Sequence, residues 1–132
     1  MYSKNSNKSK GDIGENLAIK YLISKKFEIL DRNVHLGKLA ELDIIAKKDG
    51  FLHFIEVKSV YNCGQLVDKD NFPVYNITKS KLKKLSIGIR IYLQKHRYLS
   101  EDIYIDAICI IIDKSNKKAW IKFFPNILEG ID

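Results

Sequence analysis

Three charged residues in the first half of the chain have the types and spacing of a metal-dependent nuclease site. Asp43 is followed thirteen residues later by Glu56, and Lys58 lies two residues beyond Glu56. A phosphodiester resists attack until cations neutralise its charge, and hard cations prefer carboxylate oxygens. Asp43 and Glu56 are therefore candidate ligands for Mg²⁺ or Mn²⁺. Lys58 is the candidate group for neutralising the phosphate or positioning the attacking water.

Both ends of this spacing fall in segments that are predicted to be strands. Residues 42–46 and 51–58 are rich in apolar and β-branched side chains, and the Lys-Lys-Asp-Gly sequence at 47–50 is typical of a hairpin turn. A hairpin places the start of one strand beside the end of the next, so Asp43 and Glu56 are expected to be neighbours. The two-residue period of a strand places Glu56 and Lys58 on one face.

A surface ion pair between Asp43 and Lys58 is the competing interpretation, since acids and lysines at such spacing are common by chance. The surrounding sequence argues against it, because residues 51–58 are apolar on both faces. Such a strand is usually covered on both sides. Charges that emerge from it are costly to bury unless they are paired or bind a metal, which favours a functional site.

Composition predicts one soluble domain with an anionic partner. The chain has 132 residues, 45% of them hydrophobic, and a net charge of +7. Nucleic acid is favoured over a membrane surface because no long amphipathic basic helix with a Trp- or Phe-rich face appears. The most apolar run, residues 103–112, is far shorter than the roughly 20 residues that span a bilayer, so a soluble protein is expected. A lysine-rich proteome would produce the same charge. Residues 1–10 are polar and basic and are predicted to form a disordered arm, which leaves residues 11–132 as a single domain.

The two cysteines, Cys63 and Cys109, lack the paired spacing of a zinc site. Their presence as free thiols is compatible with a reducing compartment, so a cytoplasmic location is expected. The three histidines also have no ligand spacing, and none is assigned to catalysis.

Periodicity predicts the order helix, three strands, helix, two strands, which is an α/β sandwich with a mixed sheet. The second helix begins after Thr78, a good N-cap, and carries leucine and isoleucine at helical spacing. Its other face carries candidate nucleic-acid-binding residues, although a merely solvated face is the alternative. The expected segments are residues 11–26, 27–33, 42–46, 51–58, 78–96, 103–113 and 119–124, with a polar loop at 61–75; the candidate basic residues are Lys79, Lys83, Lys84 and Arg90.

A longer series of motifs runs along the first half of the chain. It comprises Gly11-x-x-Gly14-Glu15, Asp31-Arg32-Asn33, Ala40-Glu41-Leu42-Asp43 and Phe54-Ile55-Glu56-Val57-Lys58. In these motifs the chain resembles the YraN family, which is similar to archaeal Holliday-junction resolvases and is placed among the PD-(D/E)XK nucleases. The resemblance covers residues 11–112 and implies a restriction-endonuclease-like αβββαβ core, with a mixed central sheet flanked by helices.

The resemblance also assigns roles to individual residues. It implies that Asp43 and Glu56 bind the metal, that Lys58 is the catalytic lysine, and that Glu15 is the glutamate of the first helix. A structural role for Glu15 stays open, because Asp12 as N-cap with Glu15 three residues later would form a capping box. Glu41 shares a strand face with Asp43 and is a candidate accessory ligand.

Together these features predict an endonuclease-like protein that uses Mg²⁺ or Mn²⁺ and acts on nucleic acid, with DNA favoured over RNA. Branched or otherwise non-B DNA is the candidate substrate, and related resolvases suggest a homodimer. Two alternatives keep the fold without turnover: a non-catalytic nucleic-acid-binding module, and an adaptor in DNA repair or uptake.

Overall fold

Two helices and five strands follow one another along the described part of the chain in the predicted order, α-β-β-β-α-β-β. The computed structural model describes the backbone of residues 6–62, 78–98 and 102–127, and the side chains of these ranges from residue 13 onward. The elements are α1 (Ser6–Ser24), β1 (Glu28–Leu36), β2 (Ala40–Lys48), β3 (Phe51–Tyr61), α2 (Lys79–Lys95), β4 (Ile103–Asp113) and β5 (Lys118–Phe124). This order confirms the predicted α/β fold, which is consistent with a restriction-endonuclease-like core.

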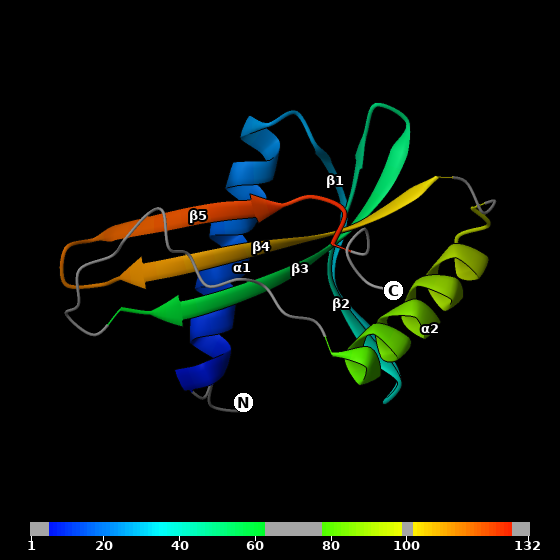
Figure 1. Ribbon diagram of the computed structural model, residues 1–132, viewed down its shortest axis with the longest axis horizontal. Coiled ribbons are helices and arrows are strands. Elements are labelled where there is room, and N and C mark those ends of the chain that lie inside the picture. The colour runs from blue at the N-terminus through cyan, green and yellow to red at the C-terminus, as the bar shows by residue number, and fades with distance from the viewer. Residues whose placement is uncertain (1–5, 63–77, 99–101, 128–132) are drawn as a thin grey trace, which may run out of the picture.

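The strands form one mixed sheet in the order β1-β2-β3-β4-β5. All neighbouring strands are antiparallel except β3 and β4, which run parallel and are connected through α2. The first helix packs against β1, β3 and β4, and the second against β2 (Figure 1). Neither helix in the described part of the chain is both long and apolar enough to cross a bilayer.

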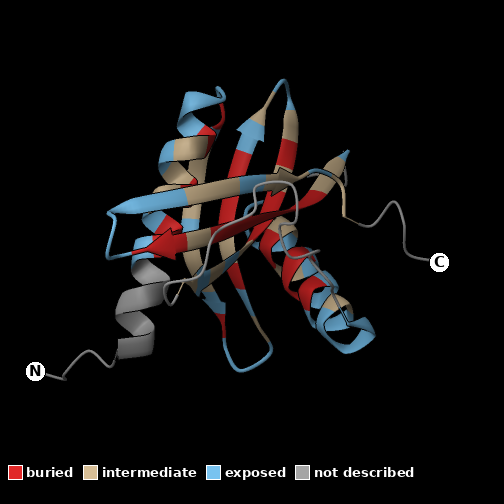
Figure 2. Cartoon of the chain, turned by 60° about the vertical axis from the view of Figure 1, so that its left-hand side comes forward, coloured by how far each residue is buried: buried red, intermediate tan, exposed pale blue. Residues whose placement is uncertain are grey.

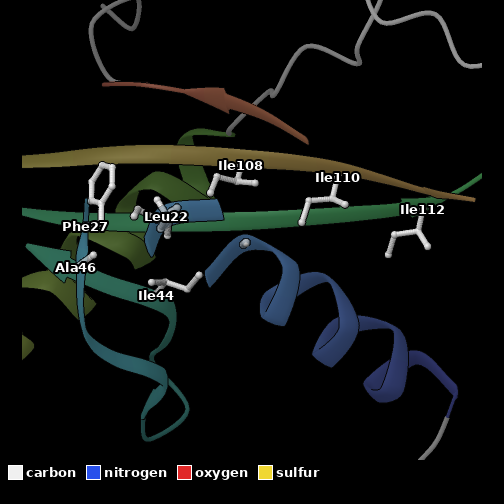
Figure 3. Packing of buried hydrophobic residues seen from close by; sticks show 9 residues of the cluster. Leu22, Phe27, Ile44, Ala46, Ile108, Ile110 and Ile112 are labelled. Carbon is white, nitrogen blue, oxygen red and sulfur yellow. The ribbon is translucent and has the colours of Figure 1, made fainter. Parts of the chain in front are cut away.

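Each face of the sheet has its own hydrophobic cluster. The cluster on the α1 face joins Ala18 and Leu22 of the helix to inward-facing residues of β2, β3 and β4, among them Ile108, Ile110 and Ile112 (Figure 3). The cluster on the α2 face joins Leu85, Ile89 and Tyr92 to β2 and β3. Buried positions accordingly run through the middle strands and along one side of α2 (Figure 2). The prediction that this strand is covered on both faces is confirmed for residues 52–56, whereas Lys58 is exposed.

The β2–β3 hairpin closes through a two-residue turn at Asp49 and Gly50. Both residues have positive φ, 52° and 84°, as a type I′ turn requires, and its twist matches that of the flanking strands. This turn fixes the register, with Ile44 opposite Ile55. Continuing the register by one residue brings Asp43 opposite Glu56.

Several element boundaries differ from those predicted by the sequence; β2 and β3, for example, extend beyond the expected residues 42–46 and 51–58. The first helix begins at Ser6 rather than residue 11, so residues 6–10 of the expected disordered arm are helical; extending a helix already held by packing costs far less than starting one. The first strand continues to Leu36, because Val34, His35 and Leu36 still pair with β2 after Asn33, whose φ is 52°. Residues 1–5 and most of the predicted 61–75 loop lie outside the described residues.

The second helix matches its prediction closely. It spans Lys79–Lys95, and the Thr78 hydroxyl accepts a hydrogen bond from the Lys81 backbone N–H at 3.1 Å. Thr78 is therefore the N-cap that the sequence indicated.

Gly88 is the point at which α2 approaches β2, and replacing it with alanine is expected to destabilise the protein. A methyl group there would lie 2.8 Å from the Ala40 Cβ and 3.3 Å from a Leu36 methyl. Overpacking of this kind costs about 1–3 kcal/mol, against a gain of about 1 kcal/mol in helix propensity. Chemical denaturation should show a net loss of about 1 kcal/mol.

The matched control for this substitution is Ser86→Ala, at an exposed position of the same helix. It should leave the free energy of unfolding unchanged or slightly raised. Equal stability of the Gly88→Ala and Ser86→Ala proteins would contradict the close approach of α2 to β2.

Candidate active site

The structure brings Asp43 and Glu56 together at the open end of the β2–β3 hairpin. Asp43 Oδ2 accepts a hydrogen bond from the Val57 backbone N–H at 2.9 Å. This bond lies just beyond the last paired residues of the two strands, Ile44 and Ile55. The expected proximity of the two acids is therefore confirmed, and the carboxylate of Asp43 is held by backbone of the strand that carries Glu56.

Burial and neighbouring negative charges raise the pKa of Asp43 from 3.8 to about 7. Burial is the largest cause, the charge of Glu56 is the next, and Glu15 and Glu41 add smaller contributions, while the hydrogen bond from Val57 opposes them. Glu56 is itself only 5% exposed. Such an environment disfavours a second negative charge and favours a cation between the acids.

Glu15 reaches the same region from α1. It is buried, and its Oε1 accepts a hydrogen bond from Arg32 Nη2 of β1 at 3.2 Å. The capping-box interpretation is wrong, because α1 begins at Ser6, so that Asp12 lies inside the helix and cannot be its N-cap. Glu15 instead adds negative potential at Asp43 and is oriented by Arg32. Arg32 belongs to the Asp31-Arg32-Asn33 motif, for which no role was predicted.

A cavity of about 380 Å³ opens between the hairpin and the start of α2. Asp43, Glu56 and Glu41 line it from the sheet, so the accessory position predicted for Glu41 is in the same cavity. Two lysines line it from the helix. The full lining is Ala40, Glu41, Asp43, Glu56, Val57, Lys81, Lys84 and Leu85.

Lys81 makes the closest described contact of a basic side chain to the acid pair. Its Nζ lies 3.0 Å from Glu56 Oε2. Sequence analysis did not single out Lys81, although a signal was present: Lys81, Lys84 and Leu85 have the i, i+3, i+4 spacing of one helical face. Because Leu85 is buried, the two lysines flank the side of α2 that faces the sheet.

Among the predicted basic residues, Lys84 lines this cavity and the rest lie outside it. Lys58 is exposed, and it lines a separate small pocket with Cys109 and Val60. Burial raises the pKa of the Cys109 thiol, and the positive charge of Lys58 opposes that rise. On α2, Lys79, Lys83 and Arg90 are exposed, whereas Lys84 lines the acidic cavity.

The donor chemistry of the cavity fits a hard divalent cation. Asp43 and Glu56 offer carboxylate oxygens, the pKa of Asp43 stays raised despite the hydrogen bond from Val57, and a lysine ammonium already lies against Glu56. Among the described residues, no three His, Cys, Asp or Glu side chains lie close enough to hold a metal together. A cation bound here would therefore have two protein carboxylates as its principal ligands and would complete its shell with water, as Mg²⁺ commonly does.

Sequence comparisons place the chain in one family. Residues 14–110 match the sequence model of the uncharacterised protein family UPF0102. A UPF0102 protein of Campylobacter fetus is 43% identical over 114 residues, covering 86% of this chain and 88% of the relative. A UPF0102 protein of Aliarcobacter butzleri is 39% identical, covering 81% and 90% respectively. The matched range includes the hairpin and α2, which together form the acidic cavity, and this chain belongs to the UPF0102 family, the YraN family that its motifs resemble.

Proposed function

We propose that this protein is a Mg²⁺- or Mn²⁺-dependent endonuclease-like phosphodiester hydrolase that acts on DNA, with branched or otherwise non-B DNA as its candidate substrate. The observation that carries the proposal is the pairing of half-buried Asp43 with buried Glu56, whose charge contributes to the raised pKa of Asp43 in a cavity open to solvent. Buried acids of this kind cost stability, and they are typical of ligand and catalytic sites.

In this proposal each described residue has a distinct task. Asp43 and Glu56 would hold the cation, Asp43 being kept in place by the Val57 N–H, and Glu15 would strengthen the negative potential behind them. A divalent cation bound there supplies positive charge to the phosphate and lowers the pKa of a bound water. The Lys84 side chain lines the same cavity and can face an incoming phosphate.

DNA would approach along α2. Lys79, Lys83 and Arg90 are exposed on this helix, and Lys84 connects them to the cavity. Contacts of this type go to phosphates, give affinity without sequence preference and weaken steeply with salt. Lys58 needs to swing from its exposed position toward the acid pair to assist the attack, which its long flexible side chain permits.

A non-catalytic nucleic-acid-binding module is the second candidate. The observation that favours it is the position of Lys58 outside the cavity, where it lies beside Cys109 rather than among the cavity-lining acids. The two candidates share the basic helix and differ in whether a phosphodiester bond is broken.

Cleavage of labelled junction, flap, single-stranded and linear duplex DNA in Mg²⁺ or Mn²⁺ distinguishes the two. Glu56→Gln removes one ligand charge with little change of shape, and it is expected to lower the cleavage rate at least about 100-fold while DNA binding persists. Lys58→Ala is expected to lower the rate by a similar factor if Lys58 assists the attack.

Glu28→Gln is the matched control, because Glu28 is an exposed glutamate at the start of β1. Its cleavage rate should equal that of the wild type. Binding without cleavage by the wild type would favour the binding module, and cleavage that survives Glu56→Gln would remove this cavity from the reaction.

A further inference from the structure

Lys81 forms an ion pair with Glu56, one of the two acids that are proposed to hold the cation. Its Nζ lies 3.0 Å from Glu56 Oε2, which is within ion-pair distance. The Glu56 side chain is only 7% exposed. The lysine side chain itself is 55% exposed. Glu56 is therefore fixed in the wall of the cavity, whereas Lys81 reaches it from the solvent side through a long, flexible side chain.

The ion pair and a metal compete for the same carboxylate. A cation bound at Glu56 brings a positive charge to within bonding distance of the oxygen that Lys81 contacts, and two cations at that separation repel strongly in a partly buried site. Lys81 has room to leave, because it is largely exposed and belongs to the first turn of α2. The backbone contacts that hold the acids, by contrast, do not depend on Lys81.

Lys84 provides an internal comparison. It lines the same cavity from the same helix and carries the same charge, but its ammonium is not within ion-pair distance of a described carboxylate. Any general effect of positive charge on the cavity should therefore appear at both lysines, and an effect of direct occupation should appear at Lys81 alone.

We propose that Lys81 is a built-in competitor for the metal: its ammonium neutralises Glu56 while the site is empty and must be displaced when Mg²⁺ or Mn²⁺ binds. This inference rests on the proposed metal site at Asp43 and Glu56. It assigns to Lys81 the control of cation affinity, so that half-occupancy of the site requires a higher divalent-ion concentration than it would without the lysine. The displaced ammonium stays beside the cavity, where a phosphate would bring negative charge.

Direct Mn²⁺ binding tests this competition without DNA or turnover. Free Mn²⁺ is measured by electron paramagnetic resonance during titration of the wild type and of Lys81→Gln. Removing a half-exposed ion pair corresponds to about a fivefold change in affinity, so Lys81→Gln should bind Mn²⁺ about fivefold more tightly. Lys81→Arg retains the positive charge and should bind no more tightly than the wild type.

Two control variants separate occupation from general charge. Lys84→Gln removes a charge from the cavity wall and Lys83→Gln removes one from the exposed face of α2, and each should change Mn²⁺ affinity less than twofold. Equal gains in Lys81→Gln and Lys84→Gln would overturn the competition, as would an unchanged or weaker affinity in Lys81→Gln.

The failure of this inference is distinguishable from failure of the proposed site. Wild-type binding with no gain in Lys81→Gln overturns the competition and leaves the metal site standing. Absence of Mn²⁺ binding in both proteins overturns the metal site and the competition together. Binding by Lys81→Gln alone supports both, with Lys81 as a strong block.

Discussion

Replacing Asp43 with asparagine is expected to stabilise the metal-free protein at pH 8. Burial, followed by the charge of Glu56, raises the pKa of this carboxyl from 3.8 to about 7. Asparagine carries no charge and still offers an oxygen to the Val57 N–H that Asp43 accepts from. The substitution therefore removes an unfavourable charge. It keeps the hydrogen bond that joins β2 to β3 at the end of the hairpin opposite the turn.

The sign of the pH dependence follows from the direction of that shift. Between about pH 4 and pH 7 the folded protein holds a proton on Asp43 that the unfolded chain has released, so the free energy of unfolding falls as pH rises through this window. The full shift corresponds to about 4 kcal/mol. Solvent reaches the carboxyl, which reduces the effect, and a gain of about 1–3 kcal/mol for Asp43→Asn at pH 8 is expected.

Urea denaturation in the presence of EDTA measures this gain. The difference between Asp43→Asn and the wild type should be larger at pH 8 than at pH 5, whereas Glu28→Gln, an exposed change on β1, should give no pH-dependent difference. Mn²⁺ should stabilise the wild type but not Asp43→Asn, because a ligand that binds only the folded state raises its stability. A variant that is less stable than the wild type at pH 8 would show that the Asp43 charge is favourable in the fold.

This cost in stability gives the acidic cavity a physical meaning. Asp43 and Glu56 are held together by the hairpin register, so neither can escape the other's charge. A chain selected for stability alone would place apolar or neutral side chains there. A cation bound at the proposed metal site would relieve the retained repulsion, which connects that site to the raised pKa of Asp43.

The sequence was sufficient to predict the hairpin and its acid pair because both depend on local information. Asp49-Gly50 specifies a two-residue turn, and that turn with alternating apolar residues determines which acid faces which. The second helix was equally local, with Thr78 as its cap. These features involve neighbours a few residues apart, where propensity and periodicity carry strong signals.

The basic side of the site could not be predicted in the same way. Lys81 reaches Glu56 only because the crossover from β3 to β4 places the start of α2 over the hairpin. Arg32 reaches Glu15 only because α1 lies against β1. Sequence spacing within one helix cannot specify which lysine contacts Glu56, which lies 25 residues before Lys81. The exposure of Lys58 likewise depends on how far each helix covers the sheet.

Replacing Gly14 with alanine is expected to lower the free energy of unfolding by about 2–3 kcal/mol. A methyl group there would overlap the Ser59 hydroxyl and lie 2.9 Å from the Ser59 Cβ. The hydroxyl can rotate away, but the Cβ is fixed to β3, so the helix or the strand must shift. The strain exceeds the roughly 1 kcal/mol that alanine gains over glycine in helix propensity.

A double-mutant cycle with Ser59→Gly isolates this contact. Removing the Ser59 side chain should weaken β3 on its own, since glycine is unfavourable in a strand, yet Gly14→Ala should cost about 1–2 kcal/mol less in that background than in the wild type. Asn16→Ala, an exposed change two residues along α1, should be neutral or slightly stabilising. An unchanged cost of Gly14→Ala in the Ser59→Gly protein would mean that the destabilisation arises elsewhere.

The same contact determines how closely the acids of the site are grouped. Glu15 follows Gly14 directly, and its charge contributes to the raised pKa of Asp43. A helix pushed away from β3 carries Glu15 with it, which weakens that contribution and the negative potential behind a bound cation. Gly14→Ala should therefore reduce Mn²⁺ affinity as well as stability, and Ser59→Gly should restore part of both, because one close approach of α1 to β3 sets the two properties together.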